Sequence, residues 1–201
     1  IKLSGDVSLF QNRISTNSTK LECDFGTMVS KANIAIPTKM PAWNSPWLED
    51  SEFDIQGVID LPRLIAVAPD LIKTQDQVTL MQGNATLSLS QSRPVSTPTA
   101  TIAPAIASSS YQIKLGNLQA NVQGKQIVWD QAMSAGLDVS GNAQGIPSLR
   151  LFCNSEFCQI EGSGDLLDGR LTAQLDLDKM EQRLSEWFVL PLESLTGSAQ
   201  A

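Results

Sequence analysis

Histidine is absent from this chain of 201 residues. Because imidazole is the usual general base near neutral pH and the commonest metal ligand, its absence argues against many hydrolytic and metal-dependent mechanisms. It also excludes a Ser-His-Asp or Cys-His catalyst. We therefore expect no catalytic residues, no metal and no cofactor, and a function other than that of an enzyme.

Charged residues are also scarce, at 17% of the chain, while 42% of the residues are hydrophobic. This mixture, completed by Ser, Thr, Asn and Gln, is typical of the half-solvated strands of secreted and envelope β-proteins. The formal net charge of −7 gives a phosphate-binding surface poor support, so we expect no nucleic-acid partner. No stretch approaches the roughly 18 apolar residues that a membrane-spanning helix needs.

The chain has only three cysteines, Cys23, Cys153 and Cys158. A bridge between the last two requires a tight loop through residues 154–156, because five strand residues would separate the sulfurs by roughly 17 Å. Alternatively, all three are small, buried or half-buried thiols. The sequence leaves both interpretations open.

One motif occurs twice. Residues 53–72 correspond to residues 169–188, a shift of 116 (169 − 53). Each copy contains a strand with alternating apolar residues, an acidic-Leu hinge and a short amphipathic helix. A further matching piece follows each helix, at residues 80–86 and 195–200. A chain that repeats its own architecture is usually an array whose units stack into a long surface.

Helix signals mark both copies. The first helix is expected near residues 61–72, where Pro62 favours helix entry and Pro69 should kink or end the helix early. The second is expected near residues 178–188, with Asp178 as the N-cap and a Glu three residues later.

A weaker correspondence extends the repeat towards the N-terminus. Residues 24–30 resemble residues 156–162, displaced by 132 (156 − 24). This displacement is 16 residues longer than that of the helices (132 − 116). The difference falls at residues 41–48, a loop rich in residues that interrupt helices and strands. Each unit is therefore interpreted as two strands, a connecting segment, an alternating strand, a helix and a Gly-containing strand.

We predict a mainly β fold: an elongated, curved, antiparallel-rich sheet, taco-like or an open barrel, with two short amphipathic helices from the repeat. Residues 1–90 form the first unit, 91–110 a Pro/Ser/Thr-rich loop or linker, and 111–201 the second, truncated unit. Since the strands on either side of the linker are alike, we favour one continuous sheet. The sequence opens inside an expected strand, residues 1–9, and stops inside the second unit. We therefore expect a piece of a longer protein whose targeting elements lie elsewhere.

The pattern [Ile/Leu]-Asp-Leu-x-x-[Leu/Met], followed by a short helix and then by a strand with Leu, Gly and Ala, resembles the AsmA-like family of bacterial envelope proteins. The run from Leu149 to Asp165 is similar to the large, repetitive AsmA-like proteins of planctomycete-type bacteria. The likeness covers most of the chain outside residues 41–48 and 92–110.

The resemblance implies a long β-rich periplasmic body, anchored to the inner membrane by parts absent from this chain, on the periplasmic side of the bacterial envelope. It implies a role in outer-membrane assembly or lipid transport, with phospholipid or acyl chains, and envelope proteins, as partners. Relatives include the TamB-type and bridge-like lipid-transfer proteins, whose groove is an elongated, taco-shaped sheet.

What covers the apolar face of the sheet is the main physical question. If the helices and loops suffice, the protein has an ordinary closed core. If they do not, a continuous apolar trough remains, and exposed apolar area of that size calls for a ligand. In either case we expect the face to be lined by Leu87, Leu89, Ile113, Leu115, Leu171 and Leu175.

Two tryptophans and two aspartates are further candidate site residues. Trp43 and Trp47 are candidates for contact with a membrane interface, a glycan or a protein, or for a latch over a sheet end. They motivate an alternative function, a structural or adhesive β-module that presents loops to a protein or glycan. Asp165 and Asp168 could suggest acid–base or Ca²⁺ chemistry, but we favour solvated turn formers.

Overall fold

The structure is a computed structural model of the 201-residue chain. It describes residues 1–36, 51–92, 108–130, 133–141, 147–165, 168–189 and 197–200. The first strands and helix are β1 (Lys2–Gly5), β2 (Ser8–Phe10), β3 (Arg13–Cys23), β4 (Gly26–Ala35), β5 (Glu52–Asp60), α1 (Leu61–Val67) and β6 (Val78–Ser92). The remaining elements are β7 (Ser108–Val122), β8 (Lys125–Trp129), β9 (Met133–Gly141), β10 (Pro147–Asn154), β11 (Cys158–Asp165), β12 (Gly169–Asp176), α2 (Leu177–Trp187) and β13 (Ser198–Gln200).

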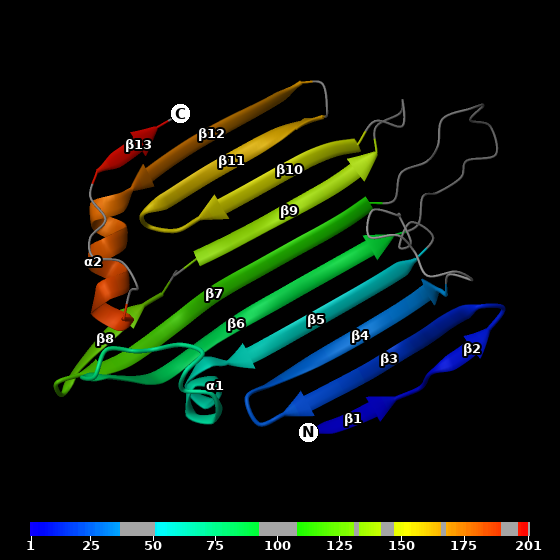
Figure 1. The fold of residues 1–201 in the computed structure, drawn as a ribbon, viewed down its shortest axis with the longest axis horizontal. Helices are drawn as coiled ribbons and strands as arrows, with labels where there is room; N and C mark the ends of the chain where they lie inside the picture. The colour runs from blue at the N-terminus through cyan, green and yellow to red at the C-terminus, as the bar shows by residue number, and fades with distance from the viewer. Residues whose placement is uncertain are drawn as a thin grey trace.

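The described residues form one thirteen-stranded antiparallel sheet (Figure 1). The strand order is β1-β3-β4-β5-β6-β7-β9-β10-β11-β12-β13, with β2 paired to β3 and β8 paired to β7. In this order β1 and β13 lie at opposite edges, so the sheet does not close. The predicted mainly β fold, with an open antiparallel sheet and two short helices, is confirmed.

Strands β6 and β7 join the two halves of the chain. Their pairing extends to Ser92 opposite Ser108, so both strands reach into the ends of the expected 91–110 linker. Residues 93–107 of that segment lie outside the described part of the chain. The sheet runs without a break between the halves, as expected for one continuous sheet.

The expected first strand, residues 1–9, is divided into β1 and β2. Both pair with β3, whose register shifts between Thr16 and Thr19. The one extra residue in β3 between these positions prevents one straight partner strand from following it, since a bulge bends its strand.

The helices begin at equivalent aspartates. The Asp60 side chain accepts a hydrogen bond from the Arg63 backbone N–H at 3.0 Å, and the Asp176 side chain accepts one from the Lys179 N–H at 2.9 Å. Both aspartates are N-caps with extended backbone. The expectation that Asp178 caps the second helix is therefore wrong, because that residue already lies in the first helical turn.

The first helix is shorter than expected. It ends at Val67, before Pro69, because proline cannot continue the hydrogen-bond ladder. The second helix, Leu177–Trp187, lies within one residue of the expected bounds.

The two repeat units share their register. The Asp60 N–H donates to the Phe25 carbonyl at 2.7 Å, and the Asp176 N–H donates to the Phe157 carbonyl at 2.9 Å. Phe25 lies in the hairpin turn between β3 and β4, and Phe157 lies in the equivalent turn between β10 and β11. The two residues are 132 positions apart (157 − 25). The weaker correspondence seen in the sequence is thus a real structural one.

The strand after each helix pairs with the strand before that helix, opposite the capping aspartate. Asn84 of β6 pairs with Asp60, and Ser198 of β13 pairs with Asp176. Each helix therefore connects two neighbouring antiparallel strands, and both helices lie towards the same end of the sheet (Figure 1).

Candidate functional site

The strand register gathers the apolar side chains on one face of the sheet. Directly opposed residues of neighbouring strands point to the same side. A row of such partners runs across the sheet from β4 to β12: Met28, Gly57, Leu87, Ile113, Ala135, Cys153, Ile160 and Ala173. We call the side on which these residues lie the apolar face.

All six residues proposed from the sequence lie on the apolar face. Leu87 pairs with Ile113, and two positions further along these strands Leu89 pairs with Tyr111. The remaining pairs are Leu115 with Ala85, Leu171 with Gly162 and Leu175 with Cys158. The side chain of Ile113 is 44% exposed and that of Leu171 57%, whereas the other four are half-buried.

The opposite face is polar. One position along each strand from that row lies a second row of cross-strand partners. From β3 to β12 its members are Lys20, Val29, Gln56, Ser88, Gln112, Gly136, Phe152, Glu161 and Thr172. Polar and charged side chains predominate in it, as expected for a sheet that is solvated on this side.

A hydrophobic core covers one end of the apolar face. Its buried members are Leu61, Val78, Leu118, Ala120, Trp129, Phe157 and Trp187. The Trp129 ring centroid lies 6.0 Å from those of Phe157 and Trp187. Ile59, Ala85, Leu115 and Cys158 pack against this cluster from the sheet. Of the six predicted residues, Leu115 therefore contributes to the core.

Charge pairs hold α2 against the sheet. Arg183 Nε lies 2.6 Å from Glu156 Oε1 in the β10–β11 turn, and Lys179 Nζ lies 3.9 Å from Glu156 Oε2. Hydrogen bonds to Glu156 and Glu186 raise the pKa of Arg183. Trp187, at the end of α2, packs against Trp129 in the core.

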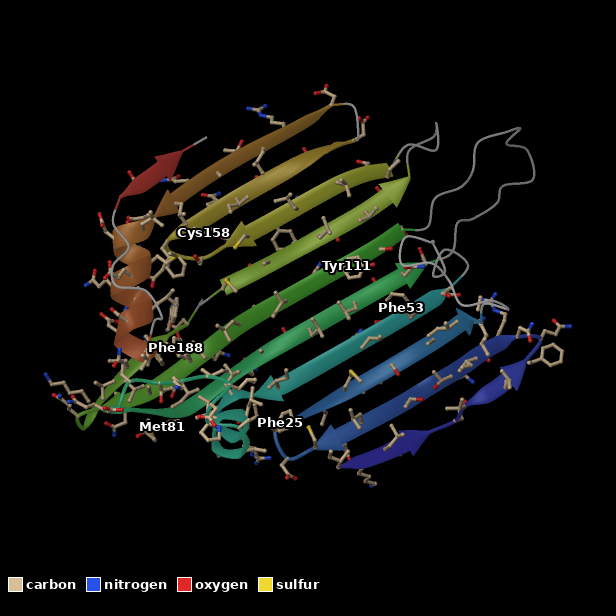
Figure 2. All side chains as sticks on the ribbon, in the orientation of Figure 1. Phe25, Phe53, Met81, Tyr111, Cys158 and Phe188 are labelled. Atoms are coloured by element: carbon tan, nitrogen blue, oxygen red, sulfur yellow. The ribbon has the colours of Figure 1, made fainter. Side chains whose placement is uncertain are left out.

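Beyond the core, the apolar face is open among the described residues. Leu137 is 37% exposed, and Met28 and Leu151 are exposed to a similar extent. Tyr111 lies near the start of β7 and Phe53 near the start of β5, away from the helices (Figure 2). The two helices and the described loops therefore do not form a core that covers the whole face.

Several residues of the face were missed in the sequence. Leu137 and Val139 alternate with Gly136 and Asp138 in β9, and Leu151 lies opposite Leu137 in β10. This alternation is visible in the sequence as a period of two residues. Counting apolar alternation over every window would have found them.

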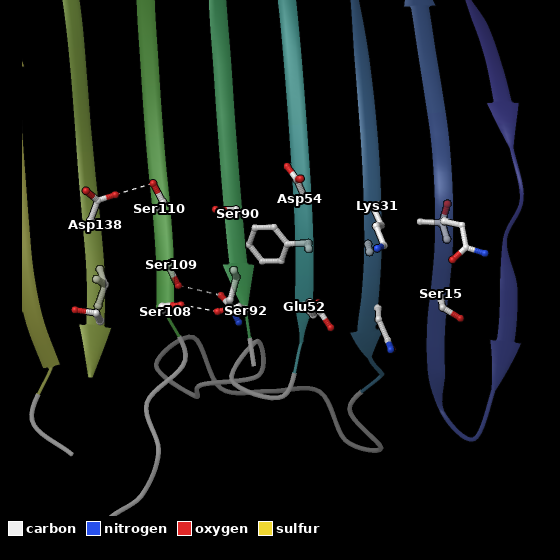
Figure 3. Close-up of a pocket in the computed structure, with 18 residues that line it drawn as sticks. Ser15, Lys31, Glu52, Asp54, Ser90, Ser92, Ser108, Ser109, Ser110 and Asp138 are labelled. Atoms are coloured by element: carbon white, nitrogen blue, oxygen red, sulfur yellow. Dashed lines mark hydrogen bonds between the residues drawn. The ribbon is translucent and has the colours of Figure 1, made fainter. Parts of the chain in front are cut away.

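A cavity of about 580 Å³ with many hydroxyl-bearing side chains in its walls lies at the other end of the strands (Figure 3). Its walls come from β3, β4, β5, β6, β7 and β9 and are rich in serine. Ser110 Oγ donates to Asp138 Oδ1 at 2.6 Å, and Ser109 Oγ donates to Gln91 Oε1 at 3.4 Å. Hydroxyl and carboxylate groups of this kind can bind polar ligands, but the arrangement pairs no nucleophile with a histidine base.

Asp165 and Asp168 are turn formers, as favoured from the sequence. The Asp168 N–H donates to Asp165 Oδ1 at 2.9 Å, and the Asp165 N–H donates to the Asp168 carbonyl at 2.7 Å. No group of three or more potential metal ligands occurs in the described part of the chain. Trp43 and Trp47 lie outside the described residues. No helix among the described residues has the length and apolarity to cross a membrane.

Comparison of the chain with protein-family models, with curated proteins and with solved structures gave no match. Any assignment of function therefore depends on the geometry of the sheet and on the motifs that resemble the AsmA-like family.

Proposed function

We propose that this chain is a non-enzymatic module of an AsmA-like envelope protein, which binds acyl chains of phospholipids on its apolar face. In this proposal the module acts on the periplasmic side of the bacterial envelope, in lipid transport or outer-membrane assembly. The observation that carries the proposal is the row of cross-strand apolar partners on an open sheet, of which the helices cover only one end.

Apolar surface that stays in contact with water is energetically unfavourable. Removing apolar area from water contributes about 25 cal/mol per Å². An acyl chain that covers Ile113 and Leu137 is therefore stabilised in proportion to the apolar area that it removes from water. Soluble domains seldom leave a contiguous apolar patch of this kind without a partner.

The dimensions of the face also suit acyl chains. The main path contains eleven strands, and ten spacings of about 4.8 Å give a width of about 48 Å. One acyl chain spans about half of a hydrocarbon core that is roughly 30 Å thick. The face is therefore wide enough for more than one chain, as a conduit along the sheet requires.

The alternative is a structural or adhesive module that presents polar groups to a protein or glycan. The serine-rich cavity at the other end of the strands favours it, because hydroxyl and carboxylate groups suit a sugar. This alternative predicts no bound lipid and leaves the apolar face without a function.

Native mass spectrometry of the gently purified protein tests the proposal. We expect phospholipid adducts, and we expect Ile113→Gln to lower the adduct fraction roughly tenfold, because a polar amide replaces an apolar contact. Val29→Gln is the matched control: Val29 is 43% exposed against 44% for Ile113, but it lies on the polar face. Lipid-free protein, or equal losses in both variants, would count against the proposal.

A further inference from the structure

Two of the three cysteines lie in contact. Cys153 is in β10 and Cys158 begins β11. The Cys158 thiol donates to Cys153 Sγ across a sulfur–sulfur distance of 3.8 Å. Both are free, half-buried thiols, so a small reagent in solvent can reach them.

The hairpin explains why the thiols meet. Cys153 pairs directly with Ile160, so Cys158 is its diagonal neighbour, two residues nearer the turn and on the same face. The turn is tight, with Ser155 N–H donating to the Cys158 carbonyl at 2.8 Å. This is the short loop that the sequence required for a bridge.

We propose that Cys153 and Cys158 form an intramolecular disulfide that locks the β10–β11 turn under oxidising conditions. The sulfurs must approach from 3.8 Å to about 2.0 Å. That change is small enough for rotation of the two side chains, with the strand pairing kept.

The co-reactant is a small disulfide, RSSR. The Cys158 thiolate attacks one sulfur of RSSR, which forms a mixed disulfide and releases RS⁻. Cys153 then loses its proton and attacks Cys158 Sγ, which forms the intramolecular bond and releases the second RS⁻. Two protein thiols are oxidised, and one RSSR is reduced to two RS⁻ thiolates, which take up the two protons that the protein thiols lose.

The order of attack follows from the surroundings of Cys153. Burial, and then the hydrogen bond from Cys158, raise the pKa of the Cys153 thiol. Its thiolate is therefore scarce at neutral pH, which makes Cys153 the poorer first nucleophile. Exchange should accelerate as the pH rises.

The turn that the bond would lock seats the second helix. Glu156 forms the 2.6 Å ion pair with Arg183, and the Phe157 carbonyl accepts the Asp176 N–H. The Phe157 ring also contacts Trp129 in the core. The disulfide would therefore stabilise the covered end of the sheet, whether or not the apolar face binds lipid.

Cys23 provides an internal control. It ends β3 just before the equivalent turn of the first unit, it is also half-buried, and its Sγ donates to the Gly26 carbonyl at 3.4 Å. The first unit has no second cysteine, so the same treatment cannot close a bridge there.

The test treats the folded protein with glutathione disulfide, followed by alkylation and peptide mapping. We expect a crosslinked peptide that joins Cys153 to Cys158 with the loss of two hydrogen atoms, while Cys23 remains reactive. We also expect a Tm increase of roughly 5 °C from closing this short loop.

Three variants separate the outcomes. Cys23→Ser should retain the crosslink and the Tm increase, whereas Cys153→Ser and Cys158→Ser should lose both. Stable glutathione adducts on Cys153 and Cys158 without a crosslink, or a crosslink that includes Cys23, would overturn the proposal.

Discussion

At the scale of single residues, glycines set how closely neighbouring strands approach. A Cβ atom on Gly26 would lie 2.6 Å from the Val58 carbonyl oxygen and 3.3 Å from Ile59 Cα. Both atoms belong to the backbone of β5, which cannot move aside as a flexible side chain can. A Cβ on Gly116, by contrast, would meet nothing within 4 Å.

We therefore predict that Gly26→Ala lowers the free energy of unfolding by about 1–3 kcal/mol, since it forces a shift between β4 and β5. Gly116→Ala should lie within about 0.5 kcal/mol of the unsubstituted protein or be slightly more stable. Urea unfolding of both variants measures the difference. Equal stabilities would mean that the close approach at Gly26 does not constrain the sheet.

Individual face residues could be predicted to a useful extent from the sequence. Leu87 and Leu89 alternate with polar residues in the sequence, and the strand register keeps both on the apolar face. Whether a residue such as Leu115 is covered by the core or left open could not be predicted. That outcome depends on where Trp129 and the helices pack, which is a long-range property.

At the scale of elements, the repeat was the most reliable signal. Both helices follow an aspartate that ends a strand, and the hydrogen bonds of Asp60 and Asp176 are equivalent. The sequence misplaced the second N-cap at Asp178, because its Glu three residues later imitates a capping box. The extended backbone of Asp176 and its bond to the Lys179 N–H decide the boundary.

The equivalence of the two caps gives a prediction. Asp60→Ala and Asp176→Ala should each lower the free energy of unfolding by about 1 kcal/mol, because each leaves a helical N–H without its side-chain acceptor. Asp60→Asn and Asp176→Asn should keep most of the stability, since asparagine also caps. Chemical denaturation followed by circular dichroism measures the effect. An alanine variant as stable as its asparagine counterpart would contradict the assignment.

At the scale of the whole molecule, the class of fold followed from alternation and from the repeat, but the coverage of the sheet did not. The sequence left a closed core and an open trough as alternatives. The register of β6, β7, β9 and β10 extends the apolar face well beyond the helices. Strand order and register depend on pairings between distant segments, and these cannot be derived from local patterns alone.

Photocrosslinking from adjacent residues of β7 tests the central claim, that acyl chains bind to one face of this sheet, most directly. A benzophenone amino acid replaces Ile113 on the apolar face or Gln112 on the polar face, and the protein is irradiated with mixed micelles of detergent and phosphatidylethanolamine. We predict lipid crosslinks from position 113 and few from position 112. Equal crosslinking from both positions, or none from position 113, would contradict the account.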